Sequence, residues 1–212
     1  MVENQGRRKQ KPKRKKPRKW VTHNGDFEHD GTIYKINVAG SGVLSLMMHP
    51  IIQQLDVCEQ QWKRVFCYMF NLHQKDNFTR DNEHLTKFFK NLNRRLQRAY
   101  NIKKIGYVWA REQGRSKSQH YHCAIFIDGD VIRRTSNKLK GIIRGAWCAL
   151  HKSHSVWFLG KAGYFIDNEE TKADCVYRLS YLAKGRGKGY RDAQVKDYST
   201  SRLIAPKRED KL

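Results

Sequence analysis

Apolar residues follow two different periods along this chain, and their alternation predicts the order of its strands and helices. Residues 64–72 are nearly all apolar or aromatic, which is typical of a central strand buried on both faces. Residues 105–112 and 120–127 predict two further strands, and the polar segment 113–119 between them predicts that they form a hairpin. Residues 156–166 predict one more strand or a hairpin.

Helical spacing separates these predicted strands. A helix that begins at Asp81 or Asn82 places apolar residues three and four positions apart, at Leu85, Phe88, Phe89, Leu92, Leu96 and Ala99. A second helix opens at Asn137 and repeats the pattern at Leu139, Ile142, Ile143, Ala146, Trp147 and Leu150. A third helix is expected from about Asn168 to Lys184, with Gly185 ending it.

The resulting order is strand, helix, strand, strand, helix, strand, helix, which predicts an α+β fold with an antiparallel sheet and helices packed on it. Before residue 64 the pattern is weaker. Residues 31–48 suggest a hairpin or a loop, and residues 51–67 fit neither period clearly.

Charge points to a nucleic acid as the partner. The chain has 43 Lys and Arg residues against 20 acidic ones, a formal net charge of +23, which is the range of a phosphate-binding surface. Residues 1–19 are expected to form a disordered basic tail that adds nonspecific attraction, although a nuclear-localisation signal also fits their composition. The remaining chain divides into a lead-in segment, a folded domain and a basic C-terminal extension, at residues 20–62, 63–185 and 186–212.

Cysteine use and hydropathy indicate a cytoplasmic protein. The 5 cysteines include no C-x-x-C pair, so they read as small core side chains in a reducing compartment. The apolar runs are too short to span a bilayer, and the N-terminus lacks the apolar core of a signal peptide.

Two histidines in the predicted hairpin suggest a metal site. His120 and His122 alternate with Tyr121, so both imidazoles lie on one face of their strand. Glu112 lies on the neighbouring strand, close enough for its carboxylate to reach the same face. Two imidazoles and a carboxylate make a three-ligand site with open positions for water and a phosphate oxygen.

The third predicted helix carries a second set of polar residues. Tyr177, Tyr181 and Lys184 fall on one helical stripe, while the apolar residues fall on the opposite side, at Cys175, Val176, Leu179, Leu182 and Ala183. A tyrosine beside a metal-bound phosphodiester is a candidate nucleophile, and the Lys184 ammonium would favour its phenolate. Two tyrosines permit alternate attacks.

In combination these motifs resemble the HUH endonuclease superfamily. The segments YVWAREQG, QHYHCAIFIDG and YRLSYLAK are similar to those of inovirus-type and prophage rolling-circle replication initiators, and the similarity runs from about residue 63 to residue 185. The resemblance implies an RRM-like (ferredoxin-like) βαββαβ order with the two-histidine strand central. It also implies a divalent Mg²⁺ or Mn²⁺ ion and site-specific nicking of single-stranded DNA at a replication origin, through a 5′-phosphotyrosine.

Residue roles follow from the same resemblance. It implies His120 and His122 as metal ligands, Glu112 as the third ligand, Tyr181 as the first nucleophile and Tyr177 as the second. The expected DNA contacts are the basic residues near these motifs, Arg111, Arg115, Lys117, Arg178, Arg186 and Lys188. The sequence contains no G-x-x-x-x-G-K-[ST] loop, so a separate host helicase is expected as a partner.

Other functions fit part of the sequence. A non-catalytic RRM-like module could stack bases on exposed sheet aromatics, with Tyr68, Tyr107, Trp109 and Tyr121 as candidates. A zinc hydrolase would use the two histidines and the glutamate, but it leaves the tyrosines without a task. An HUH relaxase or transposase would use the same chemistry as a replication initiator.

Overall fold

A computed structural model gives the structure of the protein. It describes residues 20–74, 81–113, 119–132, 134–188 and 195–206. The basic tail expected at residues 1–19 lies outside the described residues, as do Arg115 and Lys117.

A five-stranded antiparallel sheet forms the centre of the fold, with the strand order β8-β5-β7-β6-β9. The strands are β5 (Val65–Gln74), β6 (Gly106–Gln113), β7 (Gln119–Asp128), β8 (His154–Ile166) and β9 (Tyr198–Thr200). The predicted α+β class and antiparallel sheet are therefore confirmed.

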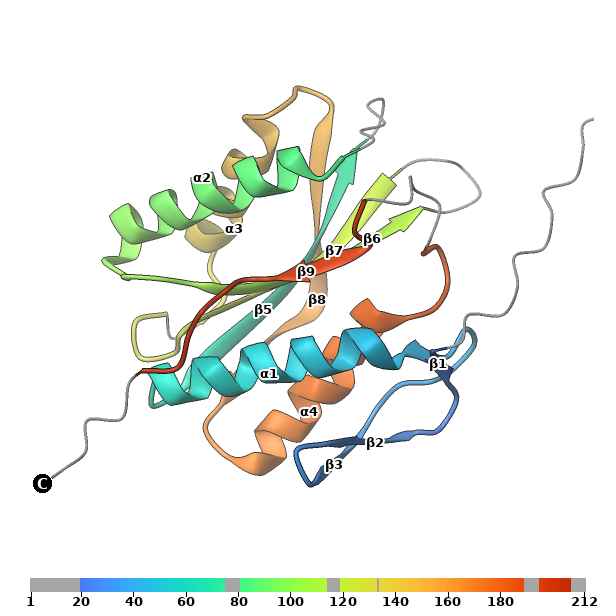
Figure 1. The fold of residues 1–212 in the computed structure, drawn as a ribbon. Helices are drawn as coiled ribbons and strands as arrows, with labels where there is room; N and C mark the ends of the chain where they lie inside the picture. The colour runs from blue at the N-terminus through green and yellow to red at the C-terminus, as the bar shows by residue number, and fades with distance from the viewer. Residues whose placement is uncertain (1–19, 75–80, 114–118, 133, 189–194, 207–212) are drawn as a thin grey trace, which may run out of the picture.

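Two helices cover one face of this sheet, α2 (Glu83–Tyr100) and α3 (Asn137–Cys148) (Figure 1). Together with β5 to β8 they give the chain order βαββαβ, and the strand order is consistent with a ferredoxin-like sheet. As expected, the two-histidine strand β7 is central, because it pairs with β5 on one side and β6 on the other.

The opposite face carries α1 (Ser45–Gln61) and α4 (Glu169–Leu179) (Figure 1). The segment before α1 forms two small ladders, β1 (Val21–Thr22) with β4 (Val43–Leu44) and β2 (Asp26–His29) with β3 (Thr32–Lys35). The hairpin suggested for residues 31–48 thus lies earlier in the chain, and the ambiguous stretch 51–67 contains most of α1 and the start of β5.

Helix α1 contains a proline that the C-terminal strand compensates. Pro50 has no N–H to donate to the carbonyl of Leu46, four residues earlier in the helix. The Tyr198 hydroxyl of β9 donates to that carbonyl instead, at 3.0 Å. The C-terminal extension, expected to be a loop, therefore supplies both an edge strand and a hydrogen bond to α1.

Helix α4 is shorter than predicted. Asn168 caps its start, with its side chain accepting from the Thr171 N–H at 2.9 Å, but the α-helix ends at Leu179 and continues as a 3₁₀ helix, η1 (Ser180–Ala183). The change to a tighter turn moves Tyr181 off the α-helical stripe that it was expected to share with Tyr177.

The apolar side predicted for this helix is buried, at Cys175, Val176, Leu179, Leu182 and Ala183. Cys58, Cys67 and Cys123 are likewise buried in the core, as expected. Within the described part of the chain, none of the helices has the length and apolar character needed to cross a bilayer.

Candidate metal and tyrosine site

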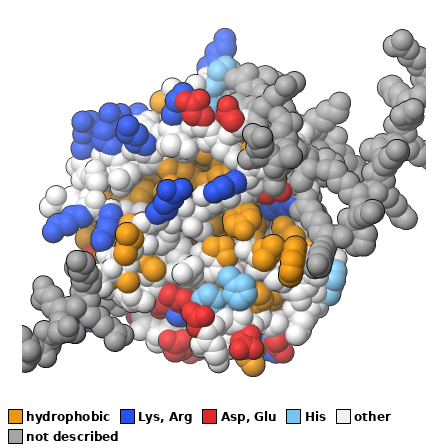
Figure 2. Space-filling model, viewed as in Figure 1, with side chains coloured by type: hydrophobic (Ala, Val, Ile, Leu, Met, Phe, Trp, Pro, Cys, Tyr) orange, Lys and Arg blue, Asp and Glu red, His pale blue; other side chains and the backbone are white. Residues whose placement is uncertain are grey.

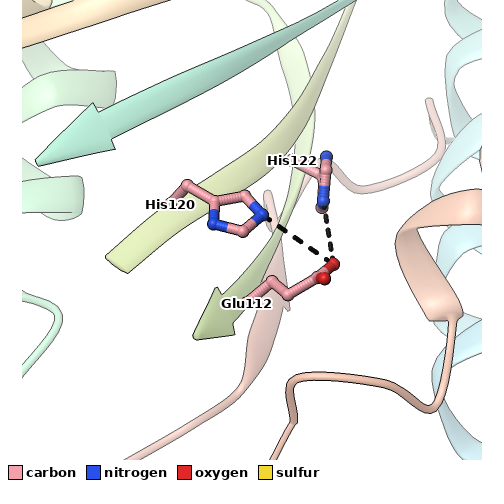
Figure 3. A group of neighbouring side chains, drawn as sticks. All are labelled: Glu112, His120 and His122. Carbon is pink, nitrogen blue, oxygen red and sulfur yellow. Dashed lines mark hydrogen bonds and ion pairs between the residues drawn. The ribbon is translucent and has the colours of Figure 1, made fainter. Parts of the chain in front are cut away.

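Strand register brings Glu112, His120 and His122 together on the face that carries α1 and α4. In the confirmed hairpin Glu112 pairs with His120, and on the other side of β7 His73 pairs with His120 and Asn71 with His122. Directly opposed residues share a sheet face, so all five side chains lie on one side. Figure 3 shows both imidazoles directed at the Glu112 carboxylate.

Distances within this triad suit a metal ion. Oε2 of Glu112 lies 3.0 Å from Nε2 of His122 and 3.9 Å from Nε2 of His120. One ligand atom from each residue falls within 4.8 Å of the others. Glu112 and His122 are buried, whereas the His120 side chain is 22% exposed, so the open side of the triad lies at His120.

The protonation state of His122 shows whether its imidazole could bind a cation. Its Nδ1 lies 2.8 Å from Oδ1 of Asn71, an acceptor, so Nδ1 carries the hydrogen. Burial lowers the pKa of His122 against the opposing effect of Glu112, which favours a neutral ring with a lone pair on Nε2. That lone pair faces a carboxylate oxygen at 3.0 Å, an arrangement that a bound cation would turn from repulsion into ligation.

The other two ligands have suitable charge states. Burial alone would raise the pKa of Glu112, but its interactions with His122, Lys188 and His120 lower it to about 2. Burial and the charge of His122 lower the pKa of His120 to about 4. At neutral pH the triad therefore offers one carboxylate and neutral imidazoles, the forms that bind metal ions.

Tyr181 lies beside this triad. Its ring centroid is 5.2 Å from that of His122, with the two rings perpendicular. Arg186 donates a hydrogen bond from Nη2 to the Tyr181 hydroxyl, and its Nε lies 3.3 Å from Oε1 of Glu112. The guanidinium thus bridges the predicted nucleophile and a predicted metal ligand.

Lys184 does not occupy the place expected of it. Its ammonium is buried and donates to Oδ1 of Asn37 at 2.9 Å and to the carbonyl of Ala39 at 2.7 Å. Burial, followed by the charge of Arg186, lowers its pKa. Lys184 therefore anchors η1 to the segment before β4, and the cation that contacts the Tyr181 hydroxyl is Arg186.

Within the described residues, no hydrogen bond, ion pair or ring contact joins the Tyr177 side chain to the triad. That side chain is 47% exposed at the end of α4, and the backbone carbonyl of Tyr177 accepts from the Ser180 hydroxyl at 2.6 Å. Of the two predicted nucleophiles, the structure brings Tyr181 to the candidate metal ligands.

The predicted DNA contacts divide into two groups. Arg178 and Arg186 lie over the Tyr181 ring, with guanidinium carbons 5.7 and 5.4 Å from its centroid, and the charge of Lys188 acts on the triad. Arg111 pairs with Tyr121, so its side chain lies on the opposite sheet face, where it is 2% exposed. A buried side chain on that face is not placed to contact DNA at this site.

A glycine allows the loop after η1 to approach Glu112 closely. Gly187 has a positive φ of +67°, and a Cβ there would lie 2.3 Å from Cγ of Glu112. Its carbonyl accepts from the backbone N–H of Gln113 at 3.0 Å. The loop therefore approaches the carboxylate closely only because residue 187 lacks a side chain.

Sequence reasoning missed two neighbours of the triad on β5. Asn71 accepts from His122, and the His73 ring stacks on His120 with centroids 5.4 Å apart. The signal was present, because Asn71 and His73 are polar residues two apart in an otherwise apolar strand, which places both on one face.

The chain belongs to the YagK/YfjJ C-terminal domain family, whose model matches residues 26–196. That span covers the sheet except β9, all four α-helices and every residue of the site described above. No curated protein and no solved structure matches the chain.

Proposed function

We propose that this YagK/YfjJ-family domain is a metal-dependent, HUH-type nickase and strand transferase that acts on single-stranded DNA. The observation that carries the proposal is the position of Tyr181, whose ring lies 5.2 Å from His122 while its hydroxyl accepts a hydrogen bond from the arginine that contacts Glu112. A nucleophile and a metal triad at one place are what phosphodiester transfer to tyrosine requires.

Glu112, His120 and His122 would hold the ion. The resemblance to HUH endonucleases leads us to propose Mg²⁺ or Mn²⁺. When bound, the ion would supply Lewis acidity at a non-bridging phosphate oxygen. Asn71 would orient His122 through Nδ1, and the partly exposed His120 lies on the side from which a phosphate would approach.

Tyr181 would attack the phosphorus. Its oxygen forms the new bond to phosphorus as the bond to the 3′ oxygen breaks, and the phenol proton passes through solvent to the departing 3′ hydroxyl. Arg186 stabilises negative charge on the Tyr181 oxygen during attack. One phosphodiester replaces another, so the bond energy is kept for rejoining the strand.

The biological role that we propose is initiation of rolling-circle replication at an origin, in the cytoplasm and with a separate host helicase. Tyr177 would perform the second transfer, after the DNA or the end of α4 has moved, because its exposed side chain leaves it accessible. Arg178 and Arg186, which lie over the Tyr181 ring, would contact the phosphates. Lys188 is 3% exposed, so it would act on the site through its charge and not by direct contact.

The alternative function, a non-catalytic RRM-like module, required exposed aromatic residues on the sheet. Tyr68, Trp109 and Tyr121 are at most 5% exposed, and Tyr107 is stacked against Phe89 with centroids 3.9 Å apart. Three of these side chains are therefore covered by protein, and in the partly buried Tyr107 one face of the ring is already occupied by Phe89.

A covalent-adduct assay tests the proposal. The full chain is incubated with Mn²⁺ and a pool of labelled single-stranded oligonucleotides of random sequence, and adducts are detected on denaturing gels. We expect an adduct with wild type and with Tyr177→Phe, and none with Tyr181→Phe, with the double variant or in EDTA. Tyr177→Phe is the matched control, because it removes the same hydroxyl from the same chain segment. An adduct of undiminished yield in the double variant, or none with wild type, would refute the assignment.

A further inference from the structure

A row of stacked rings leads from the triad to the surface. The ring of His120 stacks on His73, with centroids 5.4 Å apart and planes 10° apart. His73 in turn stacks on Trp157 of β8, with centroids 4.7 Å apart and planes 27° apart. Strand register explains the row, because His73 pairs with His120, and Trp157 pairs with Asn71 on the same face of the sheet.

Trp157 is unusually exposed for its size. It is 63% exposed, whereas Val156 and Trp147 on the other side of the sheet are buried. It also lies on β8, an edge strand of the sheet, where an exposed aromatic side chain is accessible to another molecule. Stacking on His73 occupies one side of the indole, and most of the surface of the residue is open to solvent.

We propose that Trp157 is a base-stacking platform that holds one nucleotide of a single DNA strand beside the metal triad. The proposal rests on the proposed function, which supplies the single-stranded substrate. A base stacked on the open side of Trp157 would extend the row of rings that ends at His120, and the phosphates of the same strand would then pass the cations near Tyr181. The net charge of +23 favours this polyanionic ligand over an apolar protein partner.

The contribution of base stacking to DNA binding can be measured separately from that of charge and without cleavage. Affinity is measured by fluorescence anisotropy in EDTA, with the full chain and two labelled strands of equal length and charge, one of oligothymidine and one of abasic residues. The difference between the two affinities reports contact with bases alone. We expect wild type to prefer oligothymidine about tenfold, since stacking of one base contributes about that factor.

Variants then locate the contact. Trp157→Ala should lose most of the preference, Trp157→Phe should keep it within about threefold, and Ile33→Ala, which shortens another highly exposed apolar side chain, should match wild type. Full preference in Trp157→Ala would overturn the proposal. Tighter binding of oligouridine than of oligothymidine by wild type would overturn its assignment to DNA.

Failure of the two proposals can be told apart. If wild type forms no adduct with Mn²⁺ but Trp157→Ala loses the base preference, the nickase is refuted and the stacking platform stands. If wild type forms the adduct and Trp157→Ala keeps the preference, the platform is refuted and the nickase stands.

Discussion

Replacing Gly187 by alanine should weaken Mn²⁺ binding at the proposed metal site without unfolding the domain. The new methyl would lie 2.3 Å from Cγ and 3.1 Å from Cδ of Glu112, inside any tolerable contact. Glu112 is buried, with Oε2 lying 3.0 Å from Nε2 of His122, so it cannot move away and still serve as a ligand. Either the carboxylate or the loop that carries Arg186 must shift.

Gly40 provides a matched control. Its φ is +75°, close to the +67° of Gly187, but a Cβ there would have no atom within 4 Å. Both alanine variants should lose roughly 1–2 kcal/mol of stability from the left-handed backbone. At about 2–4 °C per kcal/mol for a chain of this size, that loss lowers Tm by several degrees. Only Gly187→Ala adds the overlap with Glu112.

The assay is Mn²⁺ binding, followed by the electron paramagnetic resonance signal of the free ion and accompanied by thermal denaturation. We expect Gly40→Ala to bind Mn²⁺ as wild type does, and Gly187→Ala to bind about 10–100-fold more weakly, the usual cost of misplacing the support of a ligand. Equal Mn²⁺ affinity in the two variants would refute the role of Gly187 in seating Glu112. An affinity loss in Gly40→Ala would show that the effect comes from stability alone.

Two further predictions concern groups around the sheet. Asn71→Leu removes the acceptor that orients His122, so Mn²⁺ affinity should fall about 10–100-fold. Asn71→Asp keeps an acceptor and should retain Mn²⁺ binding. Equal Mn²⁺ affinities in the two variants would contradict this role of Asn71. His84 should make the stability of the domain depend on pH. Burial lowers its pKa from 6.5 to about 4, so the unfolded chain takes up the proton first. The free energy of unfolding should therefore fall as the pH decreases from about 6.5 to about 4. Between pH 7 and pH 4, the free energy of unfolding measured by urea denaturation should fall by up to about 3 kcal/mol less in His84→Gln than in wild type. An equal fall in the two proteins would exclude this contribution.

The order of the fold was predictable where apolar periodicity is strong. Strand β5 and helices α2 and α3 follow from local patterns, because each buries a continuous run or one clear stripe. Helix α1 was not predicted, since Pro50 argues against a helix and the compensating hydroxyl of Tyr198 comes from the far end of the chain. Strand β9 has three residues, too few to show a period.

The site was predictable to the extent that it lies within one hairpin. Alternation along β7 and the short connection to β6 are enough to bring His120, His122 and Glu112 to one face. The cation beside the proposed nucleophile was not predictable, because the 3₁₀ turn after Leu179 and the loop at Gly187 direct Arg186 to Tyr181 and Lys184 to Asn37.

The sequence by itself therefore determined the class of fold, the shared face of the three candidate ligands and the basic charge, since each depends on local period or composition. Only the tertiary structure decided which tyrosine meets those ligands, which cation contacts it and which tryptophan remains exposed beside them. These contacts join β5, β7 and β8 to η1 and the loop that follows it, segments far apart in the chain. Their proximity is set by sheet register and helix packing, which no local pattern records.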